Sequence, residues 1–119
     1  MERRCRLAGR ARFTAIRAQG RRWVHPLVIL GGLQSNLDTT RCGFIVSSKL
    51  GKAVVRNRVR RRLREAVRLC YRHITPGWDL VWIARPPILE AGFQEIAAAV
   101  EGLLRRAQVW QAPQEGQDA

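Results

Sequence analysis

The apolar residues between positions 53 and 74 recur at the spacing of an α-helix. At 100° per residue they fall within a stripe about 120° wide. Its members are Val55, Val59, Leu63, Ala66, Val67, Cys70 and Ile74. The opposite side is polar and strongly basic, and it holds Asn57, Arg58, Arg60, Arg61, Arg64, Arg68 and Arg72, with Arg56 and Arg62 flanking the stripe. The pattern predicts an amphipathic helix of about twenty residues, which ends at Pro76 and Gly77.

Three further segments carry the β-branched and apolar residues that are typical of strands. Residues 23–33 and 41–48 precede the basic helix, and residues 78–84 follow it. Pro26 either precedes the first strand or breaks it in two, because proline cannot donate to a central ladder. If Pro26 breaks the first segment into two strands, the chain has four strands in all.

Two more helices complete the predicted order. Residues 10–19 form a short helix that Gly20 ends, and residues 93–109 carry apolar positions at helical spacing. A strand, a long helix and a strand predict a crossover, so residues 41–48 and 78–84 should be parallel neighbours. We therefore predict a single-domain α+β sandwich of order α-β-β-β-α-β-α with a four-stranded mixed sheet. The domain is expected to span residues 1–110, with a disordered polar tail at 111–119.

The composition points to a class of partner. The 119 residues carry a net charge of +13, and 46% of them are hydrophobic, which is too many for a disordered polycation. Nearly all the basic residues are arginine, whose guanidinium bonds phosphates bidentately and stacks on bases. Such a charge indicates a polyanion, most often nucleic acid. A membrane-surface helix would need large hydrophobes on its apolar face, whereas this face holds Val, Leu and Ala.

Candidate catalytic and metal-binding residues are few. Cys5, Cys42 and Cys70 lie far apart without a C-x-x-C pair, which argues against a disulfide framework and against a zinc site. Gly51 and Lys52 lack the other residues of a phosphate-binding loop. Only nine residues are acidic, and no paired carboxylates stand in register, so these side chains are not expected to perform catalysis. No apolar run reaches 18 residues, and a cytoplasmic protein is expected.

Residues 41–65, RCGFIVSSKLGKAVVRNRVRRRLRE, resemble the bacterial ribonuclease P protein subunit. That family has a G-x-x-V-S strand, a K-x-G-x-A-V linker, and an R-N-R run followed by R-R-x-x-R-E. The matching residues are Gly43, Val46, Ser47, Lys49, Gly51, Ala53, Val54, Arg56, Asn57, Arg58, Arg61, Arg64 and Glu65. The resemblance extends over roughly residues 6–108 through Arg6, Leu7, Phe13, Gly20, Pro76, Gly77, Trp78, Asp79, Ile83, Ala84 and Arg85.

The resemblance implies a ribosomal protein S5 domain 2-like fold and the protein subunit of a tRNA 5′-processing endoribonuclease. It implies that Mg²⁺ is bound mainly by the RNA subunit and that the protein supplies no catalytic residue. The implied partners are ribonuclease P RNA and precursor tRNA, with no membrane and no DNA. The implied RNA-binding residues are Lys49, Lys52, Arg56, Asn57, Arg58, Arg60, Arg61, Arg64 and Arg68. The implied cleft for the single-stranded 5′ leader consists of Phe13, Arg17, Leu30 and Phe44.

Three positions depart from the family pattern. Ser48 stands where another basic residue is usual, and Arg17 and Leu30 stand where aromatic residues often stack on leader bases. For Phe13 and Phe44, packing in the core is an alternative to base contact. A second hypothesis for the whole chain is a non-catalytic RNA-binding module such as a ribosomal-type protein, which would not require the R-N-R run.

Overall fold

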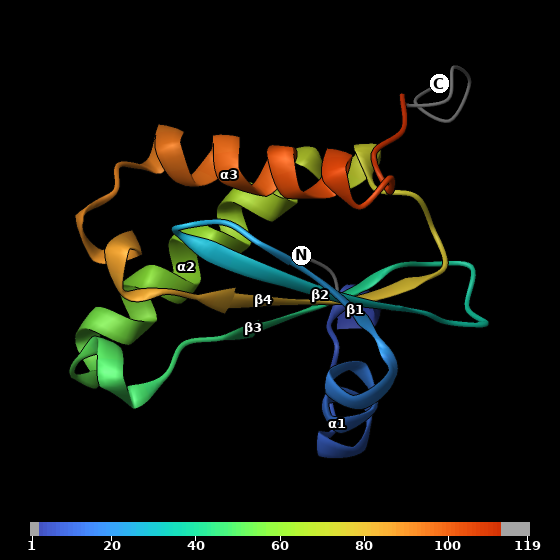
Figure 1. The fold of residues 1–119 in the computed structure, drawn as a ribbon, viewed down its shortest axis with the longest axis horizontal. Helices are drawn as coiled ribbons and strands as arrows, with labels where there is room; N and C mark the ends of the chain where they lie inside the picture. The colour runs from blue at the N-terminus through green and yellow to red at the C-terminus, as the bar shows by residue number, and fades with distance from the viewer. Residues whose placement is uncertain (1–2, 113–119) are drawn as a thin grey trace.

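The computed structural model describes residues 3–112, which form four strands and three α-helices (Figure 1). The predicted order α-β-β-β-α-β-α is confirmed. In chain order the elements are η1 (Arg3–Cys5), α1 (Arg10–Gln19), β1 (Arg21–Val24), β2 (Val28–Gln34), β3 (Arg41–Ile45), η2 (Ser48–Leu50), α2 (Ala53–Cys70), η3 (Tyr71–His73), β4 (Trp78–Ala84), η4 (Pro86–Glu90) and α3 (Phe93–Arg106).

The four strands form one mixed sheet in the order β1-β2-β4-β3. β1 with β2 and β2 with β4 are antiparallel, whereas β3 and β4 are parallel, which confirms the predicted crossover through α2. Pro26 lies in the turn between β1 and β2, so it breaks residues 23–33 into two strands. In that turn the His25 N–H donates to the Val28 carbonyl at 3.0 Å.

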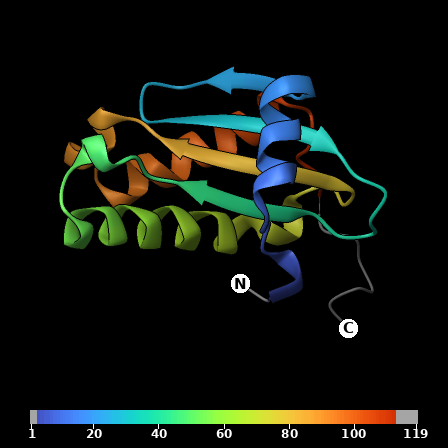
Figure 2. The ribbon, with the colours of Figure 1, turned by 90° about the horizontal axis from the view of Figure 1, so that it is seen from below.

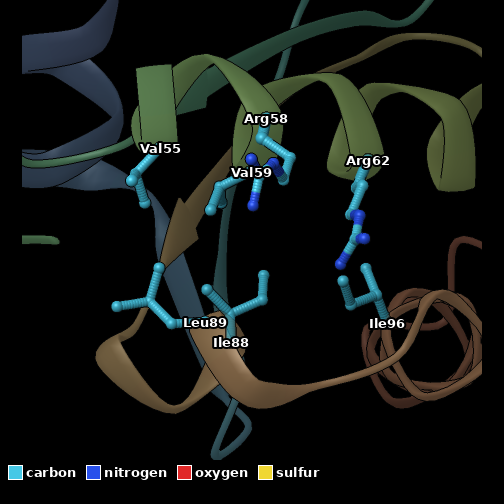
Figure 3. Close-up of a pocket in the computed structure, with 7 residues that line it drawn as sticks. All are labelled: Val55, Arg58, Val59, Arg62, Ile88, Leu89 and Ile96. Carbon is cyan, nitrogen blue, oxygen red and sulfur yellow. The ribbon is translucent and has the colours of Figure 1, made fainter. Parts of the chain in front are cut away.

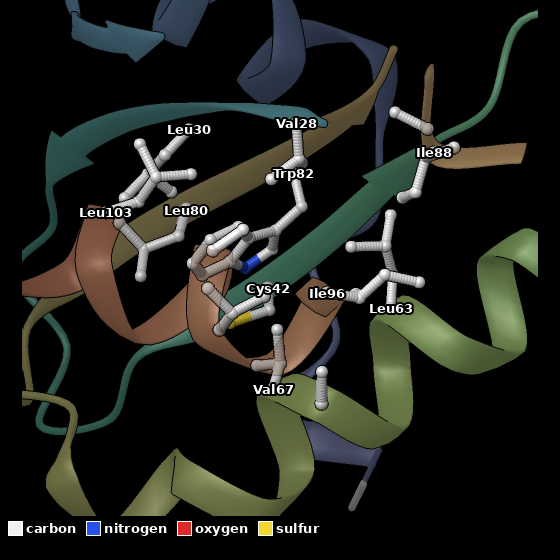
Figure 4. Packing of buried hydrophobic residues seen from close by; sticks show 14 of the residues in the cluster. Val28, Leu30, Cys42, Leu63, Val67, Leu80, Trp82, Ile88, Ile96 and Leu103 are labelled. Carbon is white, nitrogen blue, oxygen red and sulfur yellow. The ribbon is translucent and has the colours of Figure 1, made fainter. Parts of the chain in front are cut away.

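The helices cover the two faces of the sheet unequally. α2 and α3 lie together on one face, while α1 crosses the other face alone (Figure 2). The larger core lies between the sheet and the pair α2 and α3, where Trp82 of β4 is fully buried (Figure 4). α2 buries the predicted stripe in this core through Val59, Leu63, Ala66 and Val67. Burying that stripe directs the arginines of α2 outward.

The ends of both long helices differ from the sequence prediction. α2 stops at Cys70 and continues as η3. α3 stops at Arg106, because Gln108 adopts a left-handed φ of 61° and turns the chain back. The returning segment reaches η3, where the Gln111 N–H donates to the His73 carbonyl at 2.6 Å. The rest of the predicted tail, residues 113–119, lies outside the described residues, as do residues 1–2.

Both outer strands of the sheet are contacted by other parts of the chain. Leu7 donates its backbone N–H to the Cys42 carbonyl of β3 at 2.9 Å, so the segment before α1 follows the start of that strand. At the opposite edge, Arg106 Nη1 at the end of α3 donates to the Val24 carbonyl of β1 at 2.8 Å.

A buried carboxylate fixes α1 on the sheet. Asp79 of β4 is 0% exposed and accepts hydrogen bonds from Arg12 Nε of α1 at 2.5 Å and from Arg41 Nε and Nη2 of β3 at 2.8 and 2.7 Å. Arg12 also donates through Nη2 to the Gln34 carbonyl at the end of β2 at 3.0 Å. These bonds join α1 to three strands, so we name Asp79, Arg12 and Arg41 the α1 clamp.

Candidate nucleic-acid interface

The outer side of α2 is a basic surface that the buried stripe holds in place. Its side chains line an open hollow of about 330 Å³, which we name the outer hollow and which consists of Asn57, Arg60, Arg61 and Arg64. Arg60 Nη1 donates a 3.0 Å hydrogen bond to Asn57 Oδ1, and this bond orients the guanidinium along the helix. Three guanidinium groups and an amide can bond several phosphate oxygens at once.

Arg58 lies on a different side of α2. With Arg62 it faces η4 and α3 and lines a narrower crevice (Figure 3). Each of these residues precedes Arg60 or Arg64 by two positions, which corresponds to about 200° around the helix axis. The basic side predicted from the sequence is therefore divided into two groups of arginines.

Arg68 is bonded within its own helix. Its Nε and Nη2 atoms donate to the Glu65 carboxylate at 2.8 and 2.6 Å. The hydrogen bond from Arg68 lowers the pKa of Glu65, and the hydrogen bond to Glu65 raises the pKa of Arg68. Both side chains are about half exposed, and the pair reduces the net charge at this end of α2. Arg68 lies beside the outer hollow, but the Glu65 carboxylate offsets its charge.

The linker into α2 presents a second kind of anion-binding group. Lys49 and Lys52 are exposed, and Gly51 between them has a φ of 135°, which a residue with a Cβ rarely adopts. No acidic residue stands in the first turn of α2, and no side chain caps it. The free N–H groups of this turn and the two lysines thus offer positive charge at the start of α2. Arg56 closes the turn by donating through Nε to the Gly51 carbonyl at 3.2 Å.

A hollow of about 180 Å³ lies along the edge of β3, between α1 and α2. We name it the edge hollow; its lining is Arg6, Leu7, Phe13, Cys42, Gly43, Phe44, Arg60 and Arg64. The Arg64 guanidinium stands 5.7 Å from the centre of the Phe44 ring. Gly43 is needed for this packing, since a Cβ there would be 2.6 Å from Phe13 Cζ. The edge hollow combines aromatic faces with three arginines, which is a composition suited to single-stranded nucleic acid.

Leu30 does not belong to this hollow, which corrects the sequence-based placement. It is 0% exposed in the main core and pairs with Trp82, on the face covered by α2 and α3. Alternate residues of a strand point to opposite faces, so Ile29, Gly31 and Leu33 are the β2 residues on the α1 side. Phe44 also pairs with Trp82 and points to the α2 side. It still lines the edge hollow because β3 is an outer strand.

Arg17 is exposed on α1, one turn after Phe13. Within residues 3–112 its guanidinium forms no hydrogen bond or ion pair. It shares a side of the helix with Phe13, because residues four apart are neighbours on a helix surface. Phe13 is half-buried and packs on Leu7, Ile16 and Val81, so core packing accounts for part of its surface.

The sequence-based prediction missed three half-buried isoleucines on the α1 face of the sheet. Ile29, Ile45 and Ile83 occupy one cross-strand row, because Ile83 pairs with both of the others. Ile45 and Ile83 pack against the smaller apolar cluster under α1. The period of two in strands 41–45 and 78–84 could have identified Ile45 and Ile83 as members of the face opposite Phe44 and Trp82.

The described residues show no metal-binding cluster and no reactive thiol. Across residues 3–112 no three His, Cys, Asp or Glu side chains are grouped so that they could hold a metal ion. Burial raises the pKa of the Cys42 thiol to about 12 and that of Cys70 to about 11, so neither is a ready nucleophile. Nor does any helix of this part of the chain have the length and apolar character needed to cross a membrane.

The mixed sheet, with the arginine-rich helix on one face, defines an α+β protein whose basic surface is suited to nucleic acid. The ribonuclease P family model matches residues 1–108. The chain is 48% identical to the ribonuclease P protein component of Roseiflexus castenholzii, over 93% of this chain and 92% of that one. It is 44% identical to the component from Symbiobacterium thermophilum, over 90% of this chain and 94% of that one. The chain belongs to the bacterial ribonuclease P protein family.

Solved structures agree with this assignment. The Staphylococcus aureus RNase P protein matches with a TM-score of 0.82 and 30% identity, over 90% of this chain and 98% of that one. The Thermotoga maritima RNase P protein matches with a TM-score of 0.79 and 30% identity, over 85% and 96% of the two chains. The protein is thus a component of the ribonuclease P endoribonuclease and assists maturation of tRNA 5′ ends. These matches set aside the alternative of a ribosomal-type module.

Proposed function

We propose that α2 and the linker before it bind the catalytic RNA subunit. The observation that carries this proposal is the outer hollow, where Arg60, Arg61 and Arg64 project from a helix whose other side is fixed in the core. Lys49, Lys52 and the free N–H groups of the first turn of α2 extend the surface toward the linker. Arg56, Asn57, Arg58 and Arg68 complete the set of proposed RNA-binding residues.

The 5′ leader of precursor tRNA binds the edge hollow and the adjoining α1 face of the sheet. Phe44, with the Arg64 guanidinium over its ring, and the half-buried Phe13 offer stacking surfaces to unpaired bases. Such stacking is worth about 1–3 kcal/mol per base. Arg17 stands beside this path on α1 and reaches phosphates or bases. Contact with the leader favours binding of the precursor over binding of the product, because mature tRNA has no leader.

The metal ions that act in cleavage belong to the RNA subunit. Mg²⁺ requires about six oxygen ligands, usually from carboxylates, phosphates and water. Residues 3–112 hold no cluster of three ligating side chains, so the residues described do not fit a magnesium site of the protein's own. The contribution of this chain is to bind and orient RNA in the bacterial cytoplasm, and no chemical step passes through its side chains.

Reconstitution tests the proposal. The purified protein is combined with a ribonuclease P RNA, and cleavage of a precursor tRNA is followed at a magnesium concentration too low for the RNA alone. We expect stimulation, and we expect it to be larger for a precursor with a leader of several nucleotides than for one with a single nucleotide. If a folded protein that binds the RNA stimulated cleavage equally for both leader lengths, the role assigned to the edge hollow would be refuted.

A further inference from the structure

A crevice of about 60 Å³ between α2 and η4 has an apolar floor and a charged rim (Figure 3). Ile88 and Leu89 of η4 and Ile96 of α3 form the floor together with Val55 and Val59 of α2. Leu89 is 43% exposed although it is a large hydrophobic residue. In Figure 3 the side chains of Arg58 and Arg62 extend from α2 toward this floor.

The two arginines have no partner in the part of the chain that the structure describes. Neither forms a hydrogen bond or an ion pair there, in contrast to Arg60 and Arg68 on the same helix. Residues four apart are neighbours on a helix, so both guanidinium groups address the same space and repel each other. The nearby carboxylates of Glu65 and Glu95 are bonded elsewhere, to Arg68 and to the Gly92 N–H. A ligand that brings negative charge would therefore offset the repulsion between the two arginines.

We propose that the crevice binds one unpaired nucleotide of the RNA, with its base on the apolar floor and its phosphates on Arg58 and Arg62. An unpaired nucleotide combines a flat, largely apolar ring with adjacent negative charge, whereas a base-paired strand would engage only the arginines. The space holds about four to six waters, which corresponds to one six-membered ring. The inference rests on the proposed function, because it assigns a second contact to the same RNA partner.

The crevice and the outer hollow lie on different sides of the same helix, α2. Asn57 and Arg61 of the outer hollow each neighbour an arginine of the crevice in sequence. An RNA strand whose phosphates lie on the outer hollow therefore needs to pass only partway around the helix to place a nucleotide beside Leu89.

The test measures affinity for ribonuclease P RNA over a range of salt concentrations with matched variants of the full chain. Leu89→Ala should weaken binding about five- to tenfold through lost apolar contact, and the salt slope should stay unchanged because no phosphate contact is removed. Arg62→Gln should weaken binding and lower the slope by about one. Leu69→Ala is the control, because Leu69 is 56% exposed on α2 but does not line the crevice.

The outcomes are distinguishable. Binding of the Leu89→Ala protein with wild-type affinity would overturn the crevice site and would leave the proposed function intact, provided that the wild-type protein binds RNA and stimulates cleavage. The same result is expected if the crevice instead takes an acidic segment of a protein. An equal loss of RNA affinity in the Leu69→Ala control would also overturn the crevice site, since the loss in Leu89→Ala would then not be specific to the crevice. Failure of the wild-type protein to bind RNA would refute the proposed function instead.

Discussion

Replacing Asp79 by Asn should reveal how strongly the α1 clamp holds the fold together. The substitution keeps the size of the side chain but removes the charge that three donor atoms of Arg12 and Arg41 engage. Hydrogen bonds to a charged group contribute about 1.5–3 kcal/mol each when buried. The two arginine side chains are each 29% exposed, so water can hydrogen-bond to them after the substitution and offset much of the free energy that the lost bonds contributed. We expect the free energy of unfolding at neutral pH to fall by about 2–3 kcal/mol in total.

The effect should depend on pH in a direction set by Asp79. Burial alone would raise the pKa of Asp79, but hydrogen bonds from Arg41 and Arg12 outweigh it, and the net pKa lies below the usual value. A carboxyl with a lowered folded-state pKa contributes stability above its unfolded pKa of about 4 and loses it as pH falls through the folded value. The stability difference between wild type and Asp79→Asn should therefore be constant above about pH 5 and should narrow below pH 4.

Urea unfolding at several pH values measures this difference, with circular dichroism as the signal. Glu65→Gln is the control, because it also removes a carboxylate paired with arginine, but on an exposed helix surface. It should leave the free energy of unfolding nearly unchanged, because water solvates both partners of an exposed ion pair. Equal stability of the Asp79→Asn protein at neutral pH, or a gap that widens on acidification, would refute the reasoning.

Three further results are expected. Replacing Arg60, Arg61 and Arg64 together by Ala should lower the salt slope of RNA binding by about three, and an unchanged slope would show that the outer hollow does not bind phosphates. Gly43→Ala should cost about 1–3 kcal/mol in chemical unfolding, because its Cβ would lie 2.6 Å from a ring atom of the α1 phenylalanine; wild-type stability would mean that the ring moves freely. Burial raises the pKa of Cys42 to about 12, so thiol reagents at pH 8 should label it only as fast as the protein unfolds, as mass spectrometry can show.

The basic helix and the crossover could be predicted because their pattern is strong and local. The spacing of Val59, Leu63 and Val67 identifies a buried stripe with no knowledge of the rest of the chain. A helix of this length between two strands also requires a parallel pair. The structure confirms both; the ends of the helices differ by a few residues, and β3 ends at Ile45 rather than at residue 48.

The face on which each strand residue lies was harder to predict. β2 is covered on both sides, by α1 and by the pair α2 and α3, so Ile29 and Leu30 are both apolar and the strand shows no clear alternation. The sequence therefore does not tell which of them faces α1, and an error of one residue moves Leu30 to the opposite face. In the structure Phe44 reaches the proposed leader site because β3 is an outer strand. The sequence pattern does not show which strands lie at the edges of the sheet.

The α1 clamp and the division of the arginines depend on contacts between distant parts of the chain. Arg12 and Asp79 are 67 positions apart, and nothing in the local pattern pairs them. Similarly, Arg58 and Arg62 differ from Arg60 only because η4 and α3 pack against one side of α2. A helical projection gives the angles of these residues but not the neighbour on each side.

The two contacted edges of the sheet restrict what kind of partner this protein can accept. β3 has its start paired by the segment before α1, and β1 is four residues long, carries Arg21 and Arg22, and has a carbonyl bonded by Arg106. A protein partner that binds by adding a strand to a sheet would find neither edge open along its length. The fold thereby disfavours self-association through the sheet and leaves recognition to side chains and to the N-terminus of α2.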